Sequence, residues 1–148
     1  MTTPAIAVRR MAPADLPAVG RIQAASPEAS QWTPRDYLAY AAVVATENGR
    51  VVGFAVARQI PPDELEVLNL AVDPPVRRRG VGRTLLKTLR SLLPRALYLE
   101  VRASNAAARA FYAASGFQES GVRKGYYPGL GPAGSPPDDA IVMKMQKW

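Results

Sequence analysis

The sequence predicts an α/β (α+β) fold, with a mixed, mostly antiparallel sheet of about six to seven strands flanked by about four helices. Three observations support this prediction: short apolar segments typical of strands, longer segments with helical periodicity between them, and turn residues at most boundaries. The chain has 148 residues, of which 48% are hydrophobic, which suits one core. We therefore expect a single domain over residues 1–148.

The N-terminal part predicts one strand and two helices. Residues 6–10 read as a short strand, and apolar residues recur at helical spacing after Asp15, which is expected to cap that helix. A second helix is expected from Pro34 to about Tyr40, because Thr33 suits the N-cap and proline suits the first helical position. Both helices would precede the central strands.

A hairpin and a further strand follow. The dipeptide Asn48-Gly49 favours the positive φ angles of a tight turn, and apolar segments flank it at 43–46 and 51–58. Another strand is expected over 64–72, where two prolines soon end it. These segments predict adjacent antiparallel strands.

The C-terminal part predicts two helices and three strands. An amphipathic helix is expected between Arg83 and Pro94, because leucines recur on one face at Leu85, Leu86, Leu89, Leu92 and Leu93. Asn105 is expected to cap a helix over 106–115 that stops at Gly116. The remaining strands are expected over residues 97–101, 117–122 and 140–145.

Composition excludes several kinds of chemistry. The chain has no Cys and no His, which rules out a cysteine nucleophile, a Ser–His–Asp triad, a disulfide and a His- or Cys-ligated zinc site, so no metal is expected. No signal-peptide core and no apolar run of the ~20 residues that span a bilayer is evident, so we expect a cytoplasmic protein without a membrane partner. The net charge of +7 favours a polyanionic or phosphorylated ligand.

A basic turn with two glycines precedes the leucine-rich helix. Its residues run Arg77-Arg78-Arg79-Gly80-Val81-Gly82-Arg83. Glycines allow close approach of the backbone, amides at a helix N-terminus donate hydrogen bonds to anions, and arginines add charge. The pattern predicts a phosphate-binding turn, with a merely solvated basic turn as the alternative. It matches neither the G-x-G-x-x-G dinucleotide pattern nor a Walker loop.

This turn resembles a motif of the GNAT acetyltransferases. Val72-Asp73-Pro74, followed by Arg78-Arg79-Gly80-Val81-Gly82-Arg83, is similar to their R/Q-x-x-G-x-G/A motif, placed as usual between a strand and a helix. A second stretch narrows the resemblance to the RimI-like enzymes. It comprises residues 99–108, LEVRASNAAA, with the later Tyr112 and Gly116-Phe117. The resemblance covers nearly the whole chain.

The resemblance implies the GNAT fold and an acetyl-CoA-dependent N-acetyltransferase. Its acceptor would be the N-terminal α-amine of a protein, such as a small-subunit ribosomal protein that begins with alanine, and transfer would be direct within a ternary complex. Acetyl-CoA would be the cosubstrate. The implied acetyl-CoA contacts are Leu70, Ala71, Val72, Arg78, Arg79, Gly80, Val81, Gly82, Arg83 and Asn105.

Acetyl transfer needs a base for the amine and an acid for the departing thiolate. The resemblance assigns the base to Glu100, for which a solvent-facing strand position is the alternative reading. Glu66 is the rival base, because many GNAT enzymes place a catalytic glutamate on the strand before the turn. Tyr112, on the same predicted helix face as Asn105, is the implied acid, with packing against Phe111 as the alternative.

The acceptor site is less determined by the sequence. Trp32, Tyr126 and Tyr127 are candidates for an acceptor groove or for ordinary packing. Gln31 replaces a proline usual in the family, and a long Pro/Gly-rich loop follows Pro128. Two other functions stay open: acetylation of small amines such as polyamines or drugs, and a basic RNA- or ribosome-binding module. No direct nucleic-acid binding is expected, since the basic residues lie within the acetyltransferase pattern.

Overall fold

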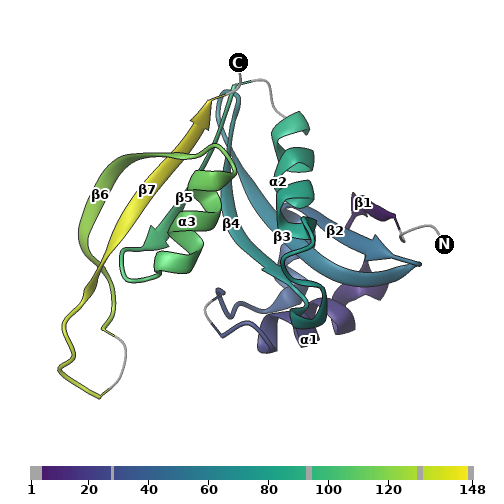
Figure 1. The fold of residues 1–148 in the computed structure, drawn as a ribbon, viewed down its shortest axis with the longest axis horizontal. Helices are drawn as coiled ribbons and strands as arrows, with labels where there is room; N and C mark the ends of the chain where they lie inside the picture. Colours follow the sequence, from purple (N-terminus) through teal and green to yellow (C-terminus); the bar gives the residue numbers. More distant parts are fainter. Residues whose placement is uncertain (1–4, 28, 93–94, 130–131, 147–148) are drawn as a thin grey trace.

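The computed structural model describes residues 5–27, 29–92, 95–129 and 132–146, and contains one seven-stranded sheet in the order β1-β2-β3-β4-β5-β7-β6 (Figure 1). Neighbouring strands are antiparallel except β4 and β5, which are parallel. The predicted fold class, a mixed and mostly antiparallel sheet flanked by helices, is confirmed. The strands are β1 (Ile6–Arg10), β2 (Ala41–Glu47), β3 (Arg50–Ile60), β4 (Glu64–Val72), β5 (Ala96–Arg102), β6 (Gln118–Tyr127) and β7 (Asp138–Gln146).

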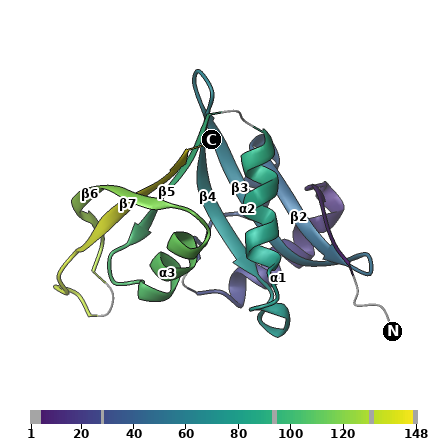
Figure 2. The ribbon, with the colours of Figure 1, turned by 45° about the horizontal axis from the view of Figure 1, so that its top comes forward.

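Helices cover both faces of the sheet (Figure 2). The α-helices are α1 (Leu16–Ala24), α2 (Val81–Leu92) and α3 (Ala106–Ala114), and the 3₁₀ helices are η1 (Pro13–Asp15), η2 (Pro34–Ala39) and η3 (Pro74–Val76). One core lies between the sheet and α2 and includes Leu85 and Leu89, while the other lies beside α1 and includes Ile22 and Tyr37. The expected end of α2 at Pro94 lies outside the described residues.

Three local predictions, a turn, a helix cap and a helix stop, are confirmed. Asn48 and Gly49 have φ angles of 53° and 77°, as a tight hairpin turn requires. Asn105 caps α3, because its side chain accepts a hydrogen bond from the Ala108 N–H at 3.1 Å. Gly116 has a φ of 103°, so it ends this helix in a left-handed conformation.

Two predicted helix caps are wrong. Asp15 stands before α1, but its carboxylate accepts from the Ala12 N–H at 2.8 Å and pairs with Arg9 at 2.7 Å, so it binds the preceding turn instead. Thr33 makes no side-chain cap, and the segment after it is the 3₁₀ helix η2. At six residues η2 is longer than most 3₁₀ helices, and it buries Tyr37 completely.

A bulge in β4 changes which face its side chains meet. Val67 pairs with Ala57 and Asn69 pairs with Val56, so Leu68 is an extra residue opposite β3. Before the bulge, Val67 packs in the core beside α2. After it, Ala71 packs in the core beside α1. The bulge therefore turns Leu70 toward the α2 side of the sheet.

The parallel strands β4 and β5 separate along their length. Their pairing begins at Glu64 and Ala96 and ends at Val67 and Leu99. Beyond that point β4 continues beside β3, while β5 continues beside β7, and Figure 1 shows the two strands diverging toward their C-terminal ends. The sheet is therefore open between the C-terminal halves of its two parallel strands.

Tyr37 provides a test of the buried polar contacts. Its hydroxyl donates to Gln23 Oε1 at 2.5 Å and accepts from Asn69 Nδ2 at 3.0 Å. Replacing Tyr37 by Phe should lower the free energy of unfolding by about 1–2 kcal/mol, because both partners lose a buried hydrogen bond. Urea denaturation measures this, with Tyr40→Phe as the control, since Tyr40 is 39% exposed. Equal losses in the two variants would contradict the prediction.

Candidate active site

Two hollows meet at the opening between β4 and β5. The first, which we name the α2 cleft, has a volume of about 590 Å³ and lies beside the N-terminus of α2. The second, which we name the β5 cavity, has a volume of about 600 Å³ and lies along the C-terminal half of β5. Four residues line both: Leu70, Asn105, Ala108 and Tyr112. The two hollows therefore adjoin at β4 and α3.

The turn before α2 is shaped to bind an anion. Arg78 and Gly80 have φ angles of 65° and 83°, and the first turn of the helix is closed by the Thr84 N–H, which donates to the Gly80 carbonyl at 3.0 Å. The preceding amides have no acceptor within the helix. These amides and the positive end of the helix dipole point to one place, which favours a phosphate.

The two glycines of the turn serve different purposes. At Gly80, a Cβ would meet no neighbouring atom, so the positive φ angle is what favours glycine there. At Gly82, a Cβ would lie 3.0 Å from Cζ of Phe111 on α3 and 3.7 Å from Cδ2 of Leu70. Gly82 therefore lets α3 approach the first turn of α2.

The arginines of the turn point in different directions. Arg78 and Arg83 line the α2 cleft, as does Arg77, which the sequence did not single out as an acetyl-CoA contact. Nε of Arg77 donates to the Val72 carbonyl at 2.9 Å. Arg79 does not line the cleft, and its guanidinium lies 2.6 Å from a carboxylate oxygen of Glu47. The remaining predicted acetyl-CoA contacts, Leu70, Ala71, Val72, Gly80, Val81, Gly82 and Asn105, all line the α2 cleft.

Glu100 and Glu66 differ in what surrounds them. Among the described residues that line the β5 cavity, Glu100 alone carries a carboxylate, and its side chain is 11% exposed. Nε of Arg123, on the edge strand β6, lies 2.9 Å from Glu100 Oε1. Glu66 lines neither hollow, and its carboxylate pairs with Arg58 of β3. The structure thus places Glu100, and not Glu66, beside the junction.

Tyr112 lies at the junction of the two hollows. Its ring packs edge-on against Phe111 and Phe117, at centroid distances of 5.2 and 5.5 Å. Burial raises the pKa of Tyr112 to about 12, so its phenol stays protonated at neutral pH and is available as a hydrogen-bond donor. Both readings of this residue, packing and donation, are compatible with its position.

Of the three aromatic residues expected near the acceptor, two line the β5 cavity. Trp32 and Tyr127 belong to its lining, and Trp32 is 46% exposed. Tyr126 does not line it and packs edge-on against Tyr127, at a centroid distance of 5.1 Å. Burial, followed by the charge of Glu100, raises the pKa of Tyr127.

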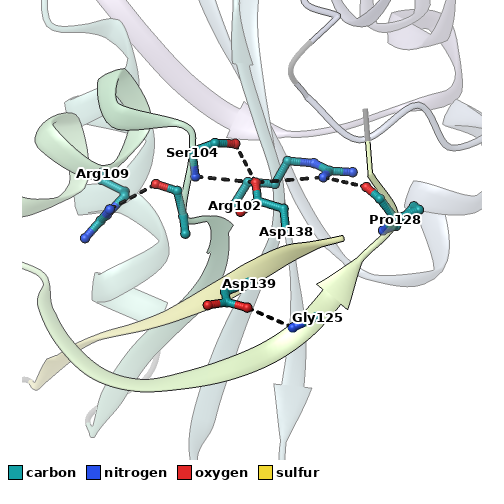
Figure 3. A network of polar contacts seen from close by, with 8 residues as sticks. Arg102, Ser104, Arg109, Gly125, Pro128, Asp138 and Asp139 are labelled. Atoms are coloured by element: carbon teal, nitrogen blue, oxygen red, sulfur yellow. Dashed lines mark hydrogen bonds and ion pairs between the residues drawn. The ribbon is translucent and has the colours of Figure 1, made fainter. Parts of the chain in front are cut away.

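Polar contacts fasten the start of β7 and the end of β6 to β5 (Figure 3). Asp138 accepts from the Ser104 hydroxyl, and this hydrogen bond holds the pKa of Asp138 below its usual range. Arg102 donates to the Pro128 carbonyl at 3.0 Å, and the Gly125 N–H donates to Asp139 at 2.8 Å. These contacts hold the strand end that bears Tyr127 against the β5 cavity.

Charge clusters elsewhere give no sign of a metal centre. Over the described ranges, no group of three or more Asp, Glu, His or Cys side chains is arranged to hold an ion. Within the same ranges, no helix is long and apolar enough to cross a membrane.

A sheet opened between two parallel strands, beside an anion-binding turn, defines a class of acyl-CoA-dependent transferases. The chain belongs to the acetyltransferase (GNAT) family, whose model matches residues 9–117. It is therefore an acetyl-CoA-dependent N-acetyltransferase, as the sequence predicted.

Its relatives include enzymes that act on protein N-termini. It is 38% identical over 140 residues to the ribosomal protein bS18-alanine N-acetyltransferase of Escherichia coli strain K12, covering 88% of this chain and 90% of that protein. It is 43% identical over 89 residues to the N-alpha-acetyltransferase RimI of Mycobacterium tuberculosis, covering 57% of this chain and 56% of that protein.

Solved structures agree with this assignment. The crystal structure of the ribosomal-protein-S18-alanine N-acetyltransferase from Escherichia coli matches with a TM-score of 0.77 at 34% identity, over 96% of this chain and 94% of that one. That of Chaetomium thermophilum Naa20 in complex with a bisubstrate analogue matches with a TM-score of 0.83 at 26% identity, over 95% and 86%. The chain therefore shares its fold and family with N-terminal acetyltransferases.

The turn yields a test of acetyl-CoA binding. Arg78→Ala should weaken the Kd for acetyl-CoA by roughly tenfold, because a charge-assisted hydrogen bond to phosphate is lost. Arg79→Ala should leave the Kd within about twofold, because Arg79 is turned toward Glu47 and outside the cleft. Isothermal titration calorimetry of both variants measures the difference. A larger loss for Arg79→Ala would show that the two arginines have the opposite roles.

Proposed function

We propose that this enzyme acetylates the N-terminal α-amine of a ribosomal protein that begins with a small residue such as alanine, and that it acts in the cytoplasm. The observation that supports this most is the junction of the two hollows, where the α2 cleft, fit for acetyl-CoA, adjoins the β5 cavity, whose lining includes the carboxylate of Glu100. The relatives named above are N-terminal acetyltransferases, which supports the same acceptor class.

The chain's own groups suit a direct transfer in a ternary complex. We assign the general base to Glu100, which takes a proton from the acceptor ammonium, whose pKa of ~7.7–8.0 keeps it mostly charged at neutral pH. The amine then attacks the thioester carbon, and we place the oxyanion against the backbone of β4 beyond Leu70, because the Leu70 N–H already donates to Asn69 Oδ1. The carbon–sulfur bond breaks as the tetrahedral intermediate collapses. The nitrogen gives up its second proton to solvent and the departing thiolate takes up one proton, so the products are the amide and the thiol.

Tyr112 is proposed to assist the departing thiolate. Because the pKa of Tyr112 is about 12 and that of a thiol is ~8.5, complete proton transfer from the phenol is uphill. Donation of a hydrogen bond to the developing thiolate has no such cost. Tyr112 therefore stabilises the leaving group first, and any proton it gives up returns from solvent.

The walls of the β5 cavity suit an extended peptide better than a compact polyamine. Trp32 and Tyr127 both line the cavity and offer flat faces with polar ends, which can contact a small side chain and a peptide backbone. Glu100, the carboxylate in the described part of the lining, is already paired with Arg123, so its charge is not free to hold a polycation. Acetyl-CoA and a protein N-terminus are the expected partners, without a membrane or nucleic acid.

Acceptor identity is tested by mass spectrometry after incubation with acetyl-CoA and two pools of amines. One pool holds peptides with a free N-terminal Ala or Ser and an internal lysine, and the other holds polyamines and aminoglycosides. We expect acetylation of the peptide α-amine and none of the internal lysine. Acetylation confined to the small amines would refute the protein acceptor and favour the small-molecule alternative.

The base assignment is tested by paired substitutions. Glu100→Gln should lower kcat by roughly 10²–10⁴-fold, the usual contribution of a general base, with little change in the Kd for acetyl-CoA. Glu66→Gln should lower kcat far less, because Glu66 lines neither hollow. Steady-state kinetics with an Ala-starting peptide measures both. The reverse order of effects would transfer the role to Glu66.

A further inference from the structure

The segment between α1 and η2 forms part of the wall of the β5 cavity. We name residues 26, 27 and 29–32 the α1–η2 segment, and those that line the cavity are Pro27, Ala29, Ser30 and Trp32. Leu68, Asn69 and Leu70 of β4 line the same cavity. The contacts that fix the distance between the α1–η2 segment and β4 therefore affect the position of the acceptor amine.

The buried side chain of Asn69, on β4, contacts both the α1–η2 segment and the backbone of β4. The Ser30 N–H donates to Asn69 Oδ1 at 3.2 Å, and Asn69 Nδ2 donates to the Ser30 carbonyl at 2.9 Å. The side-chain amide thus binds Ser30 as the peptide group of a neighbouring strand would. The same Oδ1 accepts from the Leu70 N–H at 3.0 Å, where β4 lines both hollows.

The orientation of this amide is determined by its neighbours. Asn69 Nδ2 lies 3.0 Å from Tyr37 Oη and 3.3 Å from Gln23 Oε1. Gln23 Nε2 in turn donates to the Trp32 carbonyl at 2.6 Å, so this network reaches a second point of the α1–η2 segment. Every group that Asn69 Nδ2 meets offers an oxygen, and only an amide supplies donors on one side and an acceptor on the other.

The bulge at Leu68 directs Asn69 to this place. Val67, before the bulge, faces the core beside α2, and without the extra residue Asn69 would face the same side. With the bulge, Asn69 faces α1 and the segment, while Leu70 faces the junction. One irregularity of β4 thus sets both the acceptor wall and the backbone proposed to hold the thioester.

We propose that Asn69 is a positioning residue for the acceptor: its amide sets the spacing between the α1–η2 segment and the backbone of β4 at Leu70. The acceptor's identity in this inference rests on the proposed function. Asn69 is itself part of the cavity lining, but its amide is bound to Ser30 and to the Leu70 N–H. It acts through Ser30 and Trp32, which line the acceptor's wall, and its loss displaces that wall from the reacting carbonyl.

Asn69→Asp isolates the amide's role, because the two side chains have nearly the same shape. A carboxylate only accepts hydrogen bonds, so the variant loses the donation to the Ser30 carbonyl and sets a negative charge against that oxygen and Gln23 Oε1. The α1–η2 segment moves away, while the pairing of β4 with β3 does not involve this side chain. Binding of the acceptor should therefore weaken more than binding of acetyl-CoA.

The experiment compares KM for an Ala-starting peptide, Kd for acetyl-CoA and melting temperature in the wild type, Asn69→Asp and Asn69→Ser. We expect KM to rise about tenfold or more in Asn69→Asp, the equivalent of a lost hydrogen bond, with a smaller rise for the uncharged Ser variant and a Kd within about twofold. An unchanged KM in folded variants, or equal losses in KM and Kd, would overturn the proposal. Asn48→Asp, the same exchange in the exposed β2–β3 turn, is the matched control and should change neither constant.

A second readout does not depend on turnover. The chain has two tryptophans, so Trp148→Phe leaves Trp32 as the only one, and its fluorescence reports on the segment. Acrylamide quenching of Trp32 should increase on Asn69→Asp or Asn69→Ser and stay constant on Asn48→Asp. No increase would overturn the positioning role. A wild-type enzyme that acetylates no peptide would refute the proposed acceptor, and the quenching result would still decide the role of Asn69.

Discussion

The separation of β4 and β5 is the constraint on which the rest of the site depends. Parallel strands that stop pairing at Val67 and Leu99 leave the backbone groups on their facing edges without a strand partner. Polar groups in that position favour a ligand that can hydrogen-bond like a strand, as the amide-containing arm of acetyl-CoA does. The α2 cleft and the β5 cavity lie on the two sides of this opening.

Close packing around the opening between β4 and β5 fixes the positions of the side chains that line the two hollows. Gly82 brings Phe111 to the first turn of α2, and Tyr112 consequently stands at the junction of the hollows. The bulge at Leu68 turns Leu70 toward the same place and Asn69 toward the opposite wall. Transfer between two bound substrates requires that these side chains hold the reacting atoms in register, because small errors in the placement of those atoms lower the rate strongly.

The sequence predicts what depends on neighbouring residues and misses what depends on distant ones. The turn at Asn48-Gly49 follows from local backbone preferences, so it was predictable. Aspartate is a residue type that often caps helices, but Asp15 pairs with Arg9 instead, a contact that helix propensities do not describe. Glu66 and Glu100 are rivals in the sequence, because no local pattern shows which of two strand carboxylates lines a cavity. The sequence gives no signal for Asn69, because the partners of a polar residue in an apolar strand are set by the fold.

The central claim is that both substrates meet where the two hollows adjoin, and a crystal structure with a bisubstrate analogue tests it most directly. The analogue would join coenzyme A to an Ala-starting peptide through the α-nitrogen. The account predicts its pyrophosphate on the amides of the turn before α2, its linking atoms between Leu70 and Tyr112, and its α-nitrogen facing Glu100. A linker lying outside the opening between β4 and β5, or a peptide outside the β5 cavity, would contradict the account.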